Sequence, residues 1–430
     1  GMKSGEITTG KIIRAMKMLG FDKVYDTSFS ADLTVIEEAN EFLARKVKGE
    51  KLPIFTSCCP GWVKFNEQSV PEILPNLSTC KSPQQMFGAV AKSELPKMLN
   101  IPKDKLTVVS IMPCTAKKYE ANRPEFKDEN GIKEVDYVMT TQELGKMIKE
   151  SGIVFSELEP ESIDLPFGFS TGAGVIFGNS GGVSEAVLRY AYQKVTGKQP
   201  ESIDFKEVRG NKGIKEAVVD LDGTKIRMAI VHGIANAKYI TNKIKNDEAD
   251  YDIVEVMACP GGCIGGAGQP VCHDSDIRDK RTKGIYVADK KLQLHTSQDN
   301  PFITEYYNNV LGTPNSKKAH ELLHTSYVTR KRIQSDEISL IKGTDKKALS
   351  VKVCVGTSCH LRGSQHILTN VIKRLDEESL HDYVDVRATF CTEKCDQGPT
   401  VTIGSDIMHK TNFETVYSKI IQGIDKIKKG

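Results

Sequence analysis

The 430-residue sequence contains no run of about 18 consecutive apolar residues, so it predicts no membrane-spanning helix. Its first residues also lack the apolar segment of a secretory signal, and we therefore expect a cytoplasmic protein. Neither sign of charge dominates, because 59 Lys and Arg oppose 56 Asp and Glu and leave a net charge of +3. That balance gives no broad basic surface for nucleic acid. No internal repeat and no low-complexity tract occurs, which leaves an ordinary globular composition.

Cysteine is the residue present in unusual number. The chain has 11 cysteines, which is an odd count in a long sequence without a secretory signal. A disulfide framework is a poor explanation for such a pattern. Metal ligation or thiol chemistry explains it better, and the positions of the cysteines decide which.

Short β-branched segments alternate with helical stretches along the chain. Strands are predicted at 105–112, 226–232 and 252–257, and helices at 32–47, 141–150 and 183–194. This alternation predicts an α/β fold with largely parallel sheets. The polar and charged stretch 329–348 has no sustained apolar face and predicts a linker. We therefore expect a large domain at 1–328 and a smaller one at 349–430.

Three cysteine motifs of the large domain lie directly after strands or in loops rich in Gly and Pro, at 56–62, 111–120 and 255–270. Four thiolates aimed at one point are what a [4Fe–4S] cluster needs. Glycines around the ligands let the backbone approach the sulfurs. Two alternatives stay open: a set of buried structural cysteines, or a zinc site, which favours the C-x2-C pairs that are absent here.

These motifs resemble the three signature segments of the [FeFe]-hydrogenase catalytic domain, and the resemblance covers about 1–328. It extends to Asp32-Leu33-Thr34, Glu37-Glu38-Ala39, Ser82-Pro83-Gln84-Gln85, 170–174, 177–183, 208–217 and 319–327. The resemblance implies a two-lobed α/β domain that binds an H-cluster. This cofactor is a [4Fe–4S] cluster linked to a diiron site with CO, CN⁻ and dithiolate ligands.

The resemblance also implies roles for individual residues. The cluster ligands would be Cys59, Cys114, Cys259 and Cys263, and the diiron pocket would be formed by Lys117, Met112, Met257, Pro113 and Gln84. Lys117 would donate to an iron cyanide. For Met112, Met257 and Gln84, ordinary core packing is an equally good explanation from the sequence alone. Carbonyl and cyanide ligands cannot come from side chains, so maturation proteins are implied as partners.

Cys58 is chemically separate from its neighbour Cys59, because adjacent side chains diverge and do not easily reach one cluster. A thiol with a pKa of about 8.5 suits a proton relay near neutral pH. The resemblance supplies the rest of the route: Glu38, Ser78 and Glu41. The alternative is that both glutamates merely solvate a helix surface. Cys80 and Cys272 match no cluster position and are interpreted as structural.

The small domain has its own cysteine set. Cys354 and Cys359 form C-x4-C at the end of a predicted strand, and Cys391 and Cys395 form C-x3-C in a second loop. Four thiolates in two loops suit a [2Fe–2S] cluster, with zinc as the alternative. The segment 350–428 resembles the thioredoxin-like [2Fe–2S] ferredoxin family, which also occurs in subunits of NADH dehydrogenases and NAD-reducing hydrogenases.

From this resemblance we expect reversible hydrogen oxidation and proton reduction, 2H⁺ + 2e⁻ ⇌ H₂, with electrons exchanged through iron–sulfur clusters. No G-x-G-x-x-G opens a helix after a strand, so flavin and NAD(P) would bind a partner subunit. Ferredoxin is the other redox partner considered. Two alternative functions are an H₂-sensing regulatory protein and an iron–sulfur assembly or scaffold protein of the same fold.

The sequence departs from the family pattern at its N-terminus. No ferredoxin-like domain precedes the catalytic motifs, and family members have a strand before the region that begins Gly1-Met2. A Gly before Met2 resembles the residue that tag removal leaves. We therefore expect the catalytic domain to be incomplete at its N-terminus.

Overall fold

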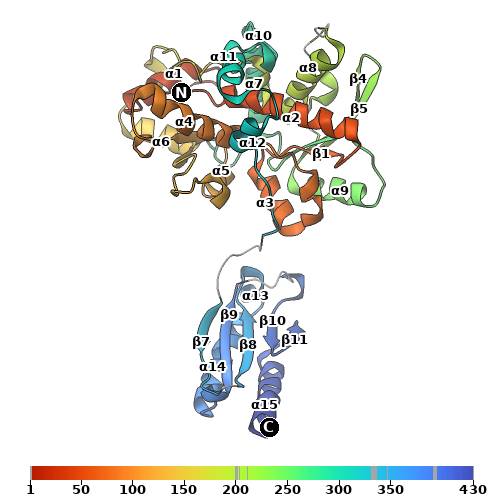
Figure 1. The fold of residues 1–430 in the computed structure, drawn as a ribbon. Coiled ribbons are helices and arrows are strands. Elements are labelled where there is room, and N and C mark those ends of the chain that lie inside the picture. Colours follow the sequence, from red (N-terminus) through yellow and green to blue (C-terminus); the bar gives the residue numbers. More distant parts are fainter. Residues whose placement is uncertain are drawn as a thin grey trace. The chain divides into compact units, whose positions relative to one another are not determined.

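The computed structural model describes residues 2–198, 202, 204–210, 212–330, 337–345, 347–390 and 395–429. The chain divides into two compact units, Gly1–Thr329 and Arg330–Gly430, which are treated separately (Figure 1). No helix in the described ranges is long and apolar enough to cross a membrane.

The first unit is mostly helical, with short strands between the helices. Its α-helices are α1 (Thr9–Met18), α2 (Ser28–Lys48), α3 (Pro60–Ser69), α4 (Pro83–Leu99), α5 (Ala116–Glu120), α6 (Thr141–Glu150), α7 (Gly172–Ile176), α8 (Gly182–Thr196), α9 (Ile234–Lys245), α10 (Ile277–Lys291), α11 (Pro301–Tyr306) and α12 (Lys317–Leu323). Its strands are β1 (Ile54–Phe55), β2 (Val109–Met112), β3 (Tyr137–Thr140), β4 (Ile214–Leu221), β5 (Thr224–His232) and β6 (Ile253–Met257).

One lobe of this unit is built on a four-stranded sheet in the order β1-β6-β5-β4. Strands β1, β6 and β5 are parallel, and β4 returns antiparallel to β5. Every residue of β6 is buried, as expected for a central parallel strand covered on both faces. Helices α3 and α9 pack on one face and α8 on the other. The second lobe contains the parallel pair β2–β3.

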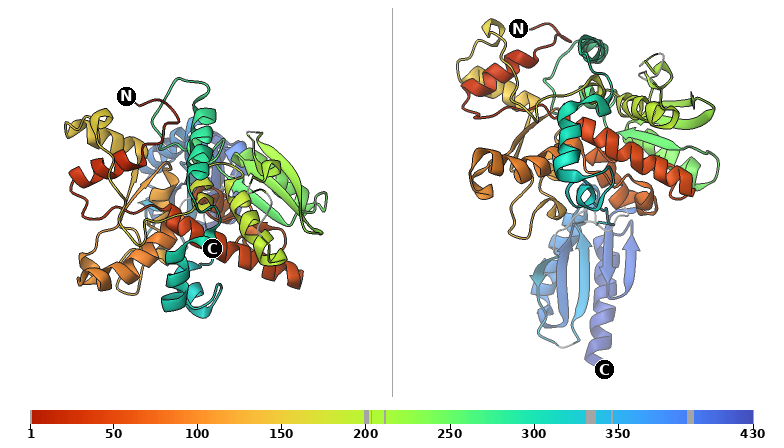
Figure 2. Two further views of the ribbon diagram at one scale, coloured as in Figure 1. Left: turned by 90° about the horizontal axis from the view of Figure 1, so that it is seen from above. Right: turned by 45° about the horizontal axis from the view of Figure 1, so that its top comes forward.

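Helix α2 lies between the two lobes. In both views of Figure 2, α8, β4 and β5 (green) lie on one side of it and α1, α4 and α6 (red to yellow) on the other. Its residues are buried along most of its length, and it packs against α4, α7 and α8. Its buried Asp32 accepts hydrogen bonds from Thr171 N–H (2.8 Å), Thr171 Oγ1 (2.6 Å) and Ser297 Oγ (2.8 Å). Residues of α2 therefore reach the space where the lobes meet.

The second unit is a five-stranded sheet in the order β11-β10-β8-β9-β7, with helices packed against it. Its elements are β7 (Ile338–Ile341), β8 (Leu349–Cys354), α13 (Thr357–Leu361), α14 (Ser364–Glu377), β9 (Val384–Thr389), β10 (Thr400–Ile403), β11 (Asp406–His409) and α15 (Phe413–Lys429). Strands β8 and β9 are parallel, and the other pairs are antiparallel. This unit has its own apolar core.

The structure corrects the predicted linker 329–348. Strand β7 lies within that range and pairs with β9 at the edge of the sheet. Three of its four residues are exposed, including Ile338 and Leu340, so β7 is a short edge strand that was not predicted among the polar residues around it. Residues 331–336 and 346 of the predicted linker lie outside the described residues.

The predicted strands at 226–232 and 252–257 correspond to β5 and β6, and the predicted helices to α2, α6 and α8. The strand predicted at 105–112 is shorter, because residues Lys103–Lys105 form a 3-10 turn and pairing begins at Val109.

Candidate active site

The first and third cysteine motifs are brought together by parallel strands. Cys58 and Cys59 follow β1, and Cys259 and Cys263 follow β6, its hydrogen-bonded neighbour. Because the carboxyl ends of parallel strands meet at one edge, both loops leave the sheet at the same place. The backbone N–H of Ala258 donates to Cys59 Sγ at 3.3 Å, so the two motifs touch at a sulfur.

The third motif also contacts the second motif, whose Cys114 follows β2 in the other lobe. The N–H of Gly268 donates to the carbonyl of Pro113 at 3.0 Å. A Cβ at Gly266 would lie 2.0 Å from the same carbonyl oxygen. At Gly262 φ is +88°, and a Cβ would lie 2.6 Å from Ser180 N. Glycine is therefore required at position 266, where the third motif passes the second, and at position 262, where it passes Ser180. The packing at Gly266 holds the loop of Cys114 against the loop of Cys259 and Cys263.

The four predicted cluster thiols, Cys59, Cys114, Cys259 and Cys263, influence one another electrostatically. Burial and then the neighbouring Cys59 and Cys114 raise the pKa of Cys263 to about 12. Burial also raises the pKa of Cys59 and Cys259. Such thiols need a cationic centre to ionise, which iron would supply.

The distances between the thiol sulfurs bear on whether they would bind a cluster or a single metal ion. Among the described residues, the only three ligand atoms within 4.8 Å of one another belong to Glu41, Cys80 and His324, and not to these four cysteines. Thiolates around one tetrahedral zinc would lie about 3.8 Å apart. No three of the four sulfurs are that close to one another in the described residues, which agrees with the wider ligand spacing of an iron–sulfur cluster.

A buried polar group lies beside the thiols. Lys117 Nζ donates to Glu120 Oε2 at 2.8 Å and to the carbonyl of Cys58 at 3.1 Å. Gln84 Nε2 donates to Glu120 Oε2 at 3.2 Å, and Ser110 Oγ donates to Gln84 Oε1 at 3.0 Å. Burial alone would lower the pKa of Lys117, but Glu120 and nearby thiols raise it overall. Lys117 therefore stays a cation, able to attract an anionic ligand in the pocket.

The remaining predicted pocket residues also lie at strand ends. Met112 is the last residue of β2 and Pro113 follows it, while Met257 is the last residue of β6. Met257 is buried and Met112 half-buried. Met112 and Met257 lie two residues before Cys114 and Cys259, and Pro113 lies directly before Cys114.

The predicted proton route begins beside Cys58. The pKa of Glu38 is raised to about 8, chiefly by burial and then by the charge of Glu41, and the Cys58 thiol is close enough to be affected by Glu38. Ser78 Oγ donates to Glu41 Oε2 at 2.9 Å, and Arg45 Nη2 donates to Glu41 Oε1 at 2.5 Å. Neither carboxyl oxygen of Glu38 has a hydrogen-bond partner in the described part of the chain. The glutamates are therefore buried groups and not a solvated helix face.

Sequence reasoning missed two residues of this site, Arg45 and Glu120. Arg45 lies four residues after Glu41 on α2, and Glu120 lies three residues after Lys117 on α5. Ion pairs at these spacings are common on exposed helices, so the signal was present but did not indicate a buried role. Of the two cysteines interpreted as structural, Cys80 is fully buried, whereas Cys272 is exposed and accepts a hydrogen bond from Asp274 N–H at 3.5 Å.

In the second unit, three of the four predicted thiols are described. Cys354 ends β8, Cys359 lies in α13, and Cys395 has a carbonyl that accepts a hydrogen bond from a serine hydroxyl of α13 at 2.8 Å. Burial and the adjacent Cys354 thiol raise the pKa of Cys359. A Cβ at Gly398 would lie 2.9 Å from Cys359 Sγ, so the backbone packs closely around the sulfur. Cys391 lies outside the described residues.

Fold and site together define an iron–sulfur protein with one thiol set in each unit. The chain matches the family model for the iron-only hydrogenase large subunit, C-terminal domain, over residues 1–267, and it belongs to this family. Residues 275–330 match the iron hydrogenase small subunit, and 339–425 the thioredoxin-like [2Fe-2S] ferredoxin. The family and fold predicted from the sequence are confirmed, and the matches support both predicted cofactors, the H-cluster and the [2Fe–2S] cluster.

Individual relatives agree with this assignment. The chain is 49% identical over 340 residues to the NADP-reducing hydrogenase subunit HndD of Solidesulfovibrio fructosivorans, which covers 77% of this chain and 58% of that protein. It thus spans little more than half the length of this relative. A structure of the [FeFe]-hydrogenase HydA1 from Chlamydomonas reinhardtii is 41% identical, with a TM-score of 0.69 over 77% of this chain and 90% of that one. The cytosolic Fe-S cluster assembly factor narfl of Xenopus tropicalis is 33% identical over 340 residues, 76% of this chain and 71% of that protein.

Proposed function

We propose that this chain is the catalytic subunit of an [FeFe]-hydrogenase and interconverts H₂ with protons and electrons. The observation that carries the proposal is the buried cation Lys117 next to four converging thiols from both lobes, with the separate thiol of Cys58 at the same place. A simple [4Fe–4S] electron-transfer site would need the four ligands but neither of the other two groups.

The residues present fit the H-cluster. Cys59, Cys114, Cys259 and Cys263 would hold its iron–sulfur part. When bound, the diiron part supplies an open iron position at which H₂ would be formed or split. Lys117, kept charged by Glu120, would donate a hydrogen bond to an anionic ligand in the buried pocket. Met112, Met257, Pro113 and Gln84 would orient the cofactor and exclude water.

The proton route follows from hydrogen-bonding capacity. With a pKa of about 8, Glu38 is largely protonated at neutral pH and can give a proton to an acceptor. Ser78 donates its only hydroxyl proton to Glu41 and accepts from Cys80 N–H at 3.2 Å, which leaves one lone pair for a donor such as Glu38. We assign the order Cys58, Glu38, Ser78, Glu41, with Arg45 at the outer end.

The second unit supports an electron-transfer role. Its [2Fe–2S] site would pass electrons to a redox partner, either a flavin- and NAD(P)-binding subunit or ferredoxin. The similarity to a subunit of an NADP-reducing hydrogenase and the match to the small-subunit model favour a multi-subunit, nicotinamide-linked complex in the cytoplasm. Maturation proteins would deliver the diiron part.

An assay of H₂ turnover tests this function. The full chain, produced together with hydrogenase maturation proteins, should evolve H₂ from a reduced low-potential dye and reduce the dye under H₂. The alternative, an assembly factor, is represented among the relatives at 33% identity. Matured protein that holds iron but shows no turnover in either direction would favour that alternative or a sensor.

A further inference from the structure

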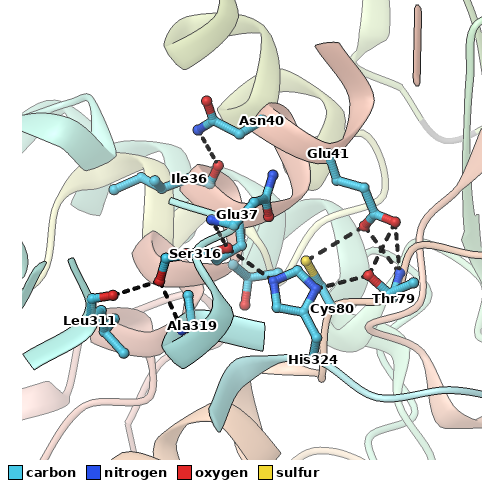
Figure 3. Close-up of polar contacts among 12 residues, drawn as sticks. Ile36, Glu37, Asn40, Glu41, Thr79, Cys80, Leu311, Ser316, Ala319 and His324 are labelled. Atoms are coloured by element: carbon cyan, nitrogen blue, oxygen red, sulfur yellow. Dashed lines mark hydrogen bonds and ion pairs between the residues drawn. The ribbon is translucent and has the colours of Figure 1, made fainter. Parts of the chain in front are cut away.

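A second polar cluster shares Glu41 with the proposed proton route, and its other members, Cys80 and His324, have no role in the proposed reaction. Figure 3 shows that His324 and Cys80 lie beside Glu41 at helix α2, with Thr79 between Glu41 and the imidazole. One nitrogen of His324, Cys80 Sγ and one oxygen of Glu41 all lie within 4.8 Å of one another. Imidazole, thiol and carboxylate together are a ligand set that zinc prefers.

The imidazole is held in the orientation that a metal ligand needs. His324 Nε2 lies 2.9 Å from Glu37 Oε2, and that carboxylate also accepts a hydrogen bond from Asn315 N–H at 2.8 Å. Glu37 therefore accepts a hydrogen bond from Nε2–H, which leaves Nδ1 without a proton, 2.8 Å from Thr79 Oγ1 on the side of Glu41. A carboxylate on one ring nitrogen and a metal on the other is the usual arrangement around protein-bound zinc.

The charges around this cluster favour a dication. Glu37, Glu38 and Glu41 all lie close enough to Cys80 to raise the pKa of its thiol, in addition to the effect of burial. Arg45 is the cation paired with Glu41, and His320 stacks on His324 with ring centroids 4.0 Å apart. Because Glu38 is largely protonated at neutral pH, two carboxylates, Glu37 and Glu41, oppose one permanent positive charge, and a divalent cation would compensate the excess.

Two groups of the cluster, the Cys80 thiol and the Thr79 hydroxyl, do not satisfy their neighbours with the hydrogen bonds they make. Cys80 Sγ is fully buried, and its contact to Glu41 Oε2 is long, at 3.9 Å. The Thr79 hydroxyl lies 3.1 Å from Glu41 Oε1 and 2.8 Å from His324 Nδ1, but its single proton can serve only one of them. Thr79 is half-buried, whereas the three proposed ligand side chains are buried.

We propose that Glu41, Cys80 and His324 form a binding site for a thiophilic divalent cation, of which Zn²⁺ is the best fit. Metal–ligand bonds of about 2.0–2.3 Å require the three atoms to move together by roughly an ångström, which side-chain rotations can supply. Cys80 would lose its proton on binding. The consequence for turnover rests on the proposed function: a cation on Glu41 removes the acceptor of Ser78 and closes the outer end of the proton route.

The test uses the full chain with its clusters assembled, titrated with Zn²⁺ alone under anaerobic conditions. We expect one zinc bound without loss of iron, and X-ray absorption at the zinc edge should show one sulfur donor. Cys80→Ala and His324→Gln should each weaken zinc binding at least tenfold, and Cys80→Ala should remove the sulfur donor. Cys80→Ser preserves the packing volume and serves if the alanine variant folds poorly. Matched controls are Cys272→Ala and His320→Gln, at exposed positions, which should bind zinc like the parent chain.

Two outcomes overturn the metal site. One is equal zinc affinity in the parent, Cys80→Ala and His324→Gln proteins, and the other is zinc uptake that releases iron in proportion. Turnover provides a separate result, because zinc should inhibit the parent and the Cys272→Ala control at concentrations at least tenfold lower than those needed for Cys80→Ala. Zinc bound through Cys80 with undiminished turnover would keep the metal site and contradict the proton route through Glu41.

Discussion

Cys58 and Cys59 are adjacent in sequence but differ in their surroundings. Cys59 Sγ accepts a backbone hydrogen bond from the loop that carries the third motif, whereas Cys58 is affected by Glu38 and contributes its carbonyl to Lys117. Cys59 therefore faces the thiol set, and Cys58 lies between that set and the buried glutamates. This difference, inferred from the sequence only as a divergence of neighbouring side chains, gives each thiol a separate test.

Replacing the two cysteines in turn should separate proton transfer from cluster binding. Cys58→Ala should keep its iron but lower H₂ turnover about 10²–10⁴-fold, as expected for loss of a positioned proton donor. Cys58→Asp should keep more activity, because a carboxyl of similar reach exchanges protons. Cys59→Ala should lose iron, because a ligand is gone. Iron content and turnover check this, and full activity in Cys58→Ala would contradict the assignment.

Glu38 predicts a pH dependence of stability. Its pKa rises from 4.5 in the unfolded chain to about 8 in the folded one, so between these values the unfolded state loses a proton that the folded state keeps. Stability therefore falls as pH rises from about 4.5 to about 8 and levels off above, by about 5 kcal/mol at most. Glu38→Gln should remove this decline. Apparent Tm values of both proteins between pH 5 and 9 measure it, and parallel curves would disprove a protonated Glu38.

At the scale of elements, the site depends on loops that follow parallel strands. The sequence predicted β5, β6 and the long helices because their apolar periodicity is strong. It also predicted the cysteine loops, since Gly and Pro frame them. It did not predict β7, an exposed edge strand, or the cluster of Thr79, Cys80 and His324. That cluster depends on contacts across more than 200 residues, which no local pattern encodes.

The close packing of the third motif against the second, at Gly266 and Pro113, can be tested by adding one methyl group. Gly266→Ala would place a Cβ 2.0 Å from the Pro113 carbonyl oxygen, so the loops must separate and Cys114 must move away from the other thiols. We expect lower iron content in the first unit. Gly145→Ala is the matched control, because its Cβ meets nothing within 4 Å in α6 and should stabilise the helix by about 0.5–1 kcal/mol. Equal iron content in both variants would show that the packing of Gly266 against Pro113 does not position Cys114.

At the scale of the whole molecule, the two units have separate cores and separate thiol sets. The division falls at Thr329 and Arg330, and β7 belongs to the second unit. Glu337, just before β7, pairs with Lys352 at 2.5 Å and with Arg387 at 3.0 Å. A fragment that begins at Glu337 therefore keeps β7 at the sheet edge, whereas one that begins at residue 350 loses it.

The fragment 337–430 should fold alone and bind a [2Fe–2S] cluster. Reduced protein should show the paramagnetic signal of that cluster, with two irons and two acid-labile sulfides per chain. The shorter fragment 350–430 should be less stable, because removal of β7 exposes the edge of β9. Stoichiometric zinc without iron or sulfide in the longer fragment would replace the electron-transfer role with a structural one.

The first unit should hold an H-cluster after maturation. The infrared spectrum of the matured full chain measures this. No side chain or simple iron–sulfur cluster gives the absorption bands of iron-bound CO and CN⁻. We predict both sets of bands in the parent chain and in Cys58→Ala, and their loss in Cys263→Ala. A matured protein that contains a full [4Fe–4S] cluster but shows neither CO nor CN⁻ bands would contradict it.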